Sequence, residues 1–169
     1  AVQKANLPTG VQEGINVIDA STVTFVLYDK DKDGKSKDYA YILGDFNNWT
    51  LSNDEKSQMY RDDANGCWWL TVTGLDPDKE YRFQYRLVAS DGSNLYVSDP
   101  YTEIVYDQWN DQYIKGVPAF PEGAKQLVSA FQVNRPAYAW KHSDFKVEDK
   151  NDLVSYEMLF RDVTKNQNI

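Results

Sequence analysis

Residues 80–87 alternate polar and apolar side chains without interruption. The apolar positions are Tyr81, Phe83, Tyr85 and Leu87, and the polar positions are Glu80, Arg82, Gln84 and Arg86. A period of two residues predicts a β-strand with one buried and one exposed face. A chain that contains such a strand must place it in a sheet whose inner face is covered.

Five other segments carry strand signals and are separated by short polar stretches. We predict strands at residues 22–28, 39–43, 67–73, 95–98 and 127–133. Turns are marked by Asn65-Gly66, Asp76-Pro77-Asp78 and Asp91-Gly92. Because short strands recur with short turns and no long helical pattern occurs, the sequence predicts an all-β antiparallel sandwich.

In two of these strands the two faces are expected to differ in burial. Residues 22–28 are expected to be half-buried, with Val23, Phe25 and Leu27 inside and Thr22, Thr24 and Val26 outside. In residues 67–73 we expect Trp68 in the core, while Trp69 points to the opposite face.

The chain divides into four parts. Residues 1–14 hold Pro8, Gly10 and Gly14 among polar side chains and predict a leading arm. Residues 15–133 form the sandwich, residues 134–151 an irregular connector, and residues 152–169 an apolar tail belonging to a different structural unit. The first residues lack both Met and an apolar leader, which indicates a mature or trimmed start.

Charge and hydropathy exclude two classes of partner. The net charge is −8, from 26 acidic and 18 basic residues, and no basic run is present, so we expect no nucleic-acid partner. No apolar run reaches eighteen residues, so we expect no membrane span. A neutral polysaccharide would not be repelled by this charge.

Residues for covalent or metal chemistry are scarce. Cys67 and His142 stand alone, and we interpret them as a buried inert thiol and a surface residue. Residues 29–34 resemble the first half of a calcium loop, but the twelfth position is Ala40 instead of Glu. No pair of carboxylates suggests glycoside hydrolysis. We expect no catalytic residue, metal or cofactor.

Aromatic and amide side chains leave carbohydrate binding as the candidate chemistry, since sugars pack C–H faces on flat rings and offer hydroxyls to polar groups at the rim. The candidate residues are Trp49, Tyr96, Arg82, Trp69, Asn47 and Asn48. For Trp49 and Tyr96, packing and sugar binding are both open. For Trp69, packing against another domain is the favoured interpretation.

The hexapeptide at residues 44–49, Gly-Asp-Phe-Asn-Asn-Trp, follows the predicted strand 39–43. It resembles the glycogen-binding-type, immunoglobulin-like sandwich at the front of α-amylase-family enzymes (glycoside hydrolase family 13), especially in forms associated with Bacteroidetes. Further segments occur in the order seen in that family, at residues 15–19, 23–28, 68–75, 80–85, 99–101 and 109–114.

The tail carries a second resemblance. Residues 152–164 are similar to the first strand of that family's catalytic (β/α)₈ barrel, with Val163 in place of the usual Phe. The chain ends five residues after Thr164, so the barrel, with its catalytic carboxylates, is expected to be missing from this chain. Apolar residues of the orphan strand at 152–169 predict a homodimer through this tail.

The resemblance implies a non-catalytic accessory domain that mainly braces the catalytic barrel of a retaining enzyme acting on α-1,4-glucans, a hydrolase or a branching enzyme. The alternative is a true α-glucan-binding module. In that case Trp49 matches the family's first Trp, Tyr96 its second and Arg82 its Lys, while its late Asn has no clear counterpart. A stand-alone adhesion sandwich is a third hypothesis. The resemblance also implies an extracellular, periplasmic or cell-surface location.

Overall fold

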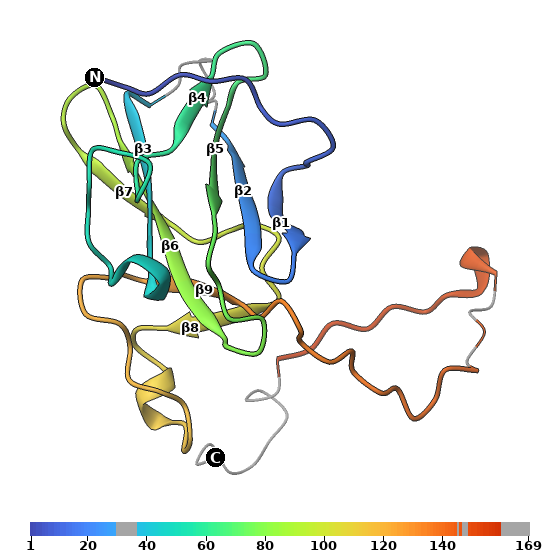
Figure 1. The fold of residues 1–169 in the computed structure, drawn as a ribbon. Coiled ribbons are helices and arrows are strands. Elements are labelled where there is room, and N and C mark those ends of the chain that lie inside the picture. Colours follow the sequence, from blue (N-terminus) through green and yellow to red (C-terminus); the bar gives the residue numbers. More distant parts are fainter. Residues whose placement is uncertain (30–36, 145, 147–148, 160–169) are drawn as a thin grey trace. The chain divides into compact units, whose positions relative to one another are not determined.

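The computed structural model describes residues 1–29, 37–144, 146 and 149–159. They fall into two compact units, residues 1–136 and 137–169. The first unit is a sandwich of two antiparallel sheets (Figure 1). One sheet has the order β1 (Gly14–Asp19), β2 (Thr22–Tyr28), β5 (Cys67–Val72), β4 (Tyr60–Asp62). The predicted all-β sandwich is confirmed.

The second sheet holds five strands. Its order is β3 (Tyr39–Gly44), β6 (Tyr81–Val88), β9 (Leu127–Phe131), β8 (Ile104–Asp107), and β7 (Asn94–Val97) also pairs with β6. Three short 3₁₀ turns complete the described elements, η1 (Asp45–Asn47), η2 (Asp111–Tyr113) and η3 (Lys150–Asp152). Every strand pairing between these elements is antiparallel.

Alternate residues of both sheets meet in one aromatic core. Phe25 of β2 and Phe83 of β6 are fully buried, and their ring centroids lie 4.8 Å apart. Phe131 of β9 packs edge-on against both rings, at 5.4 Å and 5.8 Å. Trp68 is 1% exposed and belongs to the same cluster. The apolar face predicted for residues 80–87 therefore forms the centre of the sandwich.

The six predicted strands appear as β2, β3, β5, β6, β7 and β9, each within two residues of its predicted ends. Three further strands, β1, β4 and β8, have no counterpart among the predicted strands. β4 comprises only Tyr60, Arg61 and Asp62, and its pairing with β5 rather than an apolar pattern defines it.

The expected half-burial of residues 22–28 is wrong, because β2 is buried on both faces. Thr24 and Val26 on the outer face are 2% and 0% exposed. β2 lies between β1 and β5, so Val26 has Trp69 as its neighbour in register. The hydroxyl of Thr24 bonds that of Thr71 at 2.8 Å. Side chains of neighbouring strands thus cover the face of β2 that the alternation of residue types predicted to be exposed.

The leading arm is fixed to the sandwich. Ala5 donates its backbone N–H to the carbonyl of Arg61, and Arg61 donates to the carbonyl of Gln3, so the arm extends the four-stranded sheet beyond β4. The backbone N–H of Leu7 donates to Asp62 at 2.7 Å, and the indole of Trp69 donates to the carbonyl of Ala5 at 3.0 Å. These bonds close an edge that would otherwise be free.

Acid is expected to release this arm. Hydrogen bonds from the backbone of Leu7 and from Asn65 lower the pKa of Asp62 to about 2. The free aspartate pKa is about 3.9, so this stabilisation is fully present above that pH and is lost as the pH falls through 2. The amide proton shift of Leu7 should titrate with a midpoint near 2. In Asp62→Asn that titration should vanish, and its persistence would contradict the assignment.

Several other expectations concern single residues. Cys67 is buried, and burial raises the pKa of its thiol to about 11, so the thiol is inert at neutral pH. His142 is exposed. Asp29 accepts the indole N–H of Trp68 at 2.9 Å, while the rest of the calcium-like stretch, residues 30–34, lies outside the described residues. No helix of the described chain is long and apolar enough to cross a membrane.

Among its described residues, the second unit contains η3 and otherwise irregular backbone. The ring centroids of Tyr138 and Trp140 lie 4.9 Å apart. Of the predicted barrel strand at 152–169, residues 160–169 lie outside the described residues, and residues 153–159 form no strand. Leu153 and Val154 are 56% and 94% exposed. A barrel strand takes its hydrogen bonds from neighbouring strands, and residues 153–159 pair with no strand among the described residues. The homodimer through this tail stays a prediction.

Candidate functional site

The candidate site begins where β3 turns into η1. An added Cβ on Gly44 would lie 2.6 Å from the carbonyl oxygen of Arg82, so only glycine lets the strand exit approach β6 this closely. Asn47 then fixes the loop from inside. Its side-chain oxygen accepts the N–H of Gly44 at 2.9 Å, and its amide donates to the carbonyls of Ile42 and Lys56 at 3.0 and 2.9 Å.

The two residues after η1 have left-handed backbone conformations. Asn48 has φ 53° and Trp49 has φ 56°. Asparagine tolerates this region, whereas a bulky residue such as tryptophan rarely adopts it. The turn is closed by the N–H of Trp49, which donates to the carbonyl of Gly44 at 3.0 Å. Strained backbone of this kind is frequent where a protein holds a side chain ready for a ligand.

Asp45 connects the Trp49 loop to the five-stranded sheet. One oxygen accepts the indole N–H of Trp49 at 2.9 Å. The other accepts the backbone N–H and the Nε–H of Arg82 at 2.8 and 3.1 Å. Burial raises the pKa of Asp45, but the hydrogen bonds from Arg82 and Trp49 outweigh it, and the net pKa is lowered. Asp45 is therefore an ionised anchor for both candidate residues.

Arg82 lies on the outer face of β6 and is held from three sides. Its NH1 donates to the carbonyl of Ala119 at 2.8 Å, its other nitrogens bond Asp45, and its guanidinium lies 5.9 Å from the ring centre of Tyr106. Tyr106 in turn bonds Glu80, and burial together with this bond raises its pKa to about 12. The guanidinium is thus a fixed part of the wall beside Trp49.

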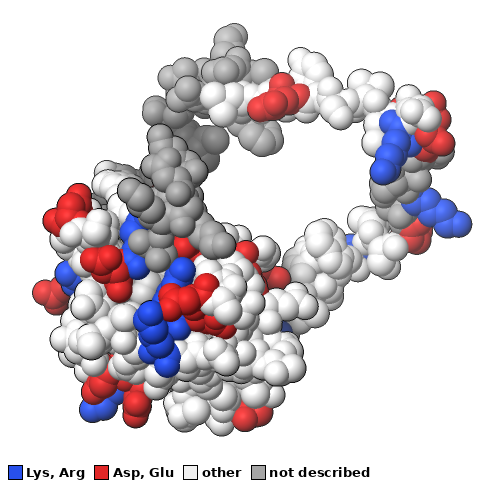
Figure 2. Space-filling view, turned by 90° about the horizontal axis from the view of Figure 1, so that it is seen from above, with Lys and Arg blue, Asp and Glu red and all other residues white. Residues whose placement is uncertain are grey.

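Two adjoining cavities flank the ring of Trp49, and both are lined by Asp45, Asn48, Trp49 and Arg82. One continues to Tyr106 and Pro118, and the other to Pro121 and Gly123. A half-buried ring edged by an arginine, a carboxylate and an amide matches the requirements of a sugar. In the view of Figure 2, acidic and basic side chains are interspersed over the sandwich, without an extended surface of one sign.

Tyr96 lies on β7, directly opposite Arg86 of β6. Its ring is flanked by two cations, Lys125 Nζ at 4.9 Å and the Arg86 guanidinium at 5.9 Å from the ring centre. Arg82 and Arg86 are four residues apart on one face of β6, so their Cα atoms are separated by roughly 13 Å. Arg82 lies beside Trp49, and Arg86 lies beside Tyr96. Tyr96 lines neither of the two cavities beside Trp49, but it lies over the same face of β6 as Arg82.

Trp69 is placed elsewhere, on β5 of the other sheet. It stacks on Tyr60 with ring centroids 4.9 Å apart, and its indole N–H is used by Ala5. The structure therefore brings together Trp49, Arg82, Asn47 and Asn48, extends their face toward Tyr96, and separates Trp69 from it.

Asp45, Tyr106 and Lys125 belong to this site and were not among the predicted residues. The hexapeptide contains a signal for Asp45, since a carboxylate four residues before Trp49 in a tight loop is within reach of the indole. Tyr106 and Lys125 reach the site only through β8 and the residues before β9, and no local pattern indicates this.

Comparison with known proteins shows what this part of the chain is similar to. Residues 38–102, which contain Trp49, Arg82 and Tyr96, match carbohydrate-binding module 48 (isoamylase N-terminal domain). The chain is also similar to the 1,4-alpha-glucan branching enzyme GlgB of Bacillus subtilis (strain 168), with 32% identity over 85 residues. This match covers 42% of the chain and 13% of the relative, so the chain spans only a small part of GlgB. The predicted resemblance of the sandwich is confirmed.

Proposed function

We propose, from the match of residues 38–102 to carbohydrate-binding module 48, that the sandwich is an accessory domain that binds α-1,4-linked glucan. The observation that carries this proposal is the ring of Trp49. It is held in a left-handed backbone conformation at a strand exit, and its indole N–H is fixed by Asp45. A ring that served packing alone would not need a strained backbone beside two open cavities.

The glucan would pack its C–H faces on Trp49 and direct hydroxyl groups to Asn48 and Arg82. Arg82 retains N–H groups beyond the three that Asp45 and Ala119 use, because a guanidinium carries five. The glucan would then follow β6 toward Tyr96. No residue of the site carries out covalent chemistry in this proposal. The role of the domain is to bring a polymeric substrate to a catalytic barrel that lies in the same parent protein.

The parent protein is proposed to be an α-glucan-active enzyme, since the similar GlgB is named a 1,4-alpha-glucan branching enzyme. Transfer to form a branch and hydrolysis of an α-1,4 bond are both compatible with such a domain. Retention of configuration and a location outside the cell stay predictions.

Native gels that contain glycogen or amylopectin test the function directly. The full chain should be retarded in both and should migrate normally in gels with a β-linked glucan of similar size. Tyr96→Ala should reduce the retardation only in part, because the Trp49 end of the face remains. Normal migration of the unmodified chain in every gel would overturn the proposed function.

Bracing of the barrel is a second candidate function, and exposed apolar residues favour it. Val17 of β1 and Tyr101 are 53% and 60% exposed, and they line one cavity with Ile15. Apolar side chains gathered around a cavity are typical of surfaces covered by another domain. In the parent enzyme, Val17→Lys should lower the melting temperature of the catalytic part and leave glycogen retardation unchanged. An unchanged melting temperature would exclude this surface as the brace.

A further inference from the structure

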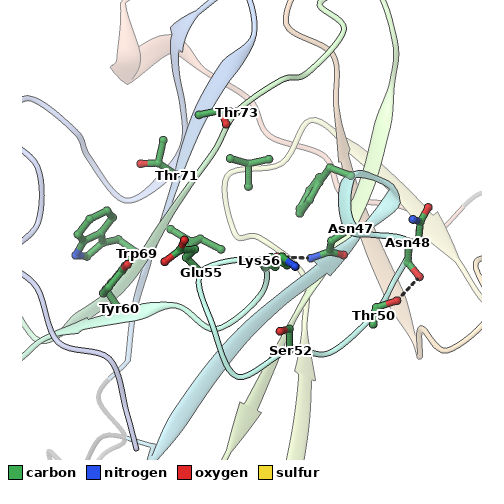
Figure 3. A pocket seen from close by; sticks show the side chains of 13 residues that line it. Asn47, Asn48, Thr50, Ser52, Glu55, Lys56, Tyr60, Trp69, Thr71 and Thr73 are labelled. Carbon is green, nitrogen blue, oxygen red and sulfur yellow. Dashed lines mark hydrogen bonds between the residues drawn. The ribbon is translucent and has the colours of Figure 1, made fainter.

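A groove of about 560 Å³ lies between the loop at residues 46–56 and β5 (Figure 3). It exists because β4 is short. β4 pairs with β5 only along Cys67–Trp69. From Leu70 onward β5 is paired with β2 on one edge, and its other edge, the one that faces β4, has no strand partner among the described residues. Phe46, Leu70 and Val72 line this groove and also belong to or pack against the core. Its size is in the range of small-ligand sites, about 300–1,000 Å³.

Two stacked rings line one end of the groove. Tyr60 and Trp69 lie 4.9 Å apart with an interplanar angle of 27°, side by side on β4 and β5. The bond from the Trp69 indole to Ala5 fixes the orientation of this pair. Figure 3 shows both rings at the end of the groove away from Asn48. They provide a rigid aromatic wall.

Some polar side chains of the groove are hydrogen-bonded within the protein, and others are not. The side chains of Asn47, Ser52 and Thr71 are bonded within the protein. In contrast, the side chains of Asn48, Glu55, Lys56 and Thr73 and the hydroxyl of Tyr60 make no hydrogen bond among the described residues. Glu55 and Lys56 are adjacent, exposed and of opposite charge. The groove therefore suits a neutral ligand rich in hydroxyl groups.

We propose that this groove is a second α-glucan subsite, joined to the Trp49 site across Asn48. This subsite presupposes the α-glucan binding proposed above. Asn48 lines both the groove and the two cavities beside Trp49, so the groove and these cavities adjoin each other at the loop of residues 45–50. A glucan chain that packs on Trp49 would cross Asn48, bond Glu55, Lys56 and Thr73, and end against Tyr60 and Trp69. In this proposal Trp69 contacts the glucan at one end of its path, and Trp49 contacts it at the other end.

The test compares a short and a long glucan on the full chain, by calorimetric titration and by amide NMR shifts. In the groove variant, which combines Glu55→Ala and Lys56→Ala, maltoheptaose affinity should fall about tenfold, the effect of losing one or two net hydrogen bonds. Maltotriose affinity should not change, because the short sugar is held at Trp49. The matched control combines Glu103→Ala and Lys115→Ala, two exposed residues of opposite charge that do not line the groove or the cavities beside Trp49, and should bind both sugars normally.

The amide shifts identify where the long sugar lies. Maltoheptaose, and not maltotriose, should shift the amides of Glu55 and Thr73. If both sugars bind and depend on Trp49, but the groove variant binds maltoheptaose normally and these amides do not move, the subsite is wrong while the proposed function stands. If neither sugar binds the unmodified chain, both fall. If the groove variant changes only self-association in light scattering, the groove binds a second copy of the chain, and the subsite is wrong.

Discussion

Replacing Asp45 by alanine is expected to destabilise the sandwich by about 2–3 kcal/mol, since hydrogen bonds to a charged group contribute about 1.5–3 kcal/mol each and this carboxylate is partly exposed. Asp45 is the shared acceptor of Trp49 and of three nitrogens of Arg82, and its side chain retains 18% of its exposure. Its removal leaves Arg82 without a counterion and frees the indole. Denaturant unfolding measures the loss of stability.

The destabilisation caused by Asp45→Ala should be smaller in acid than at neutral pH. Because the pKa of Asp45 is lowered in the folded protein, its stabilising contribution is complete above the free aspartate pKa of about 3.9 and declines as the pH falls through the lowered value. The difference in unfolding free energy between the unmodified chain and Asp45→Ala should therefore shrink below pH 4. Asp91→Ala is the matched control, because Asp91 also has a lowered pKa but accepts only from Ser93 in an exposed turn. A loss as small as that control's would contradict the anchoring role.

Trp49→Ala is expected to reduce the affinity for maltooligosaccharides by about thirtyfold, which corresponds to a central binding residue worth about 2 kcal/mol. The ring supplies the flat apolar surface on which the sugar packs, and no other aromatic side chain lines both cavities beside it among the described residues. Calorimetric titration with maltoheptaose measures the change.

Two further variants separate the ring from the loop that holds it. Trp49→Gly also removes the ring but relieves the left-handed backbone, so it should bind as weakly as Trp49→Ala while unfolding at a higher denaturant concentration than that variant. Trp109→Ala removes a tryptophan that is 56% exposed on a different loop, and it should bind normally. Equal affinities for Trp49→Ala and Trp109→Ala would show that the ring of Trp49 is not a sugar platform.

The strands that local pattern predicted share one property, a side-chain period that depends only on the backbone of the strand itself. β6 has four alternating apolar residues, and its position follows from them alone. β4 and β8 are three and four residues long, and they are strands because β5 and β9 are beside them. The burial of Val26 and Thr24 likewise depends on neighbours that are distant in sequence.

Within the candidate site, the hexapeptide at residues 44–49 was sufficient to place Trp49 in a tight turn at a strand exit, because glycine and asparagine there favour such a turn. The role of Trp49 in sugar binding stays a prediction. The relation of the Trp49 ring to Arg82 depends on the register of β3 with β6, in which Gly44 lies opposite Phe83. Trp69, a candidate by residue type, was separated from Trp49 by the assignment of β3 and β5 to different sheets.

The sequence by itself therefore determined the all-β class, the main strands, the buried aromatic face of β6 and the position of Trp49 in the turn after β3, since each of these follows from short-range backbone geometry and residue type. Only the tertiary structure decided that Asp45 joins Trp49 to Arg82, that the leading arm binds Asp62 and Trp69, and that a short β4 opens a groove beside β5. These features arise from the pairing of segments far apart in the chain, and pairing is set by the free energy of the whole core rather than by any one segment.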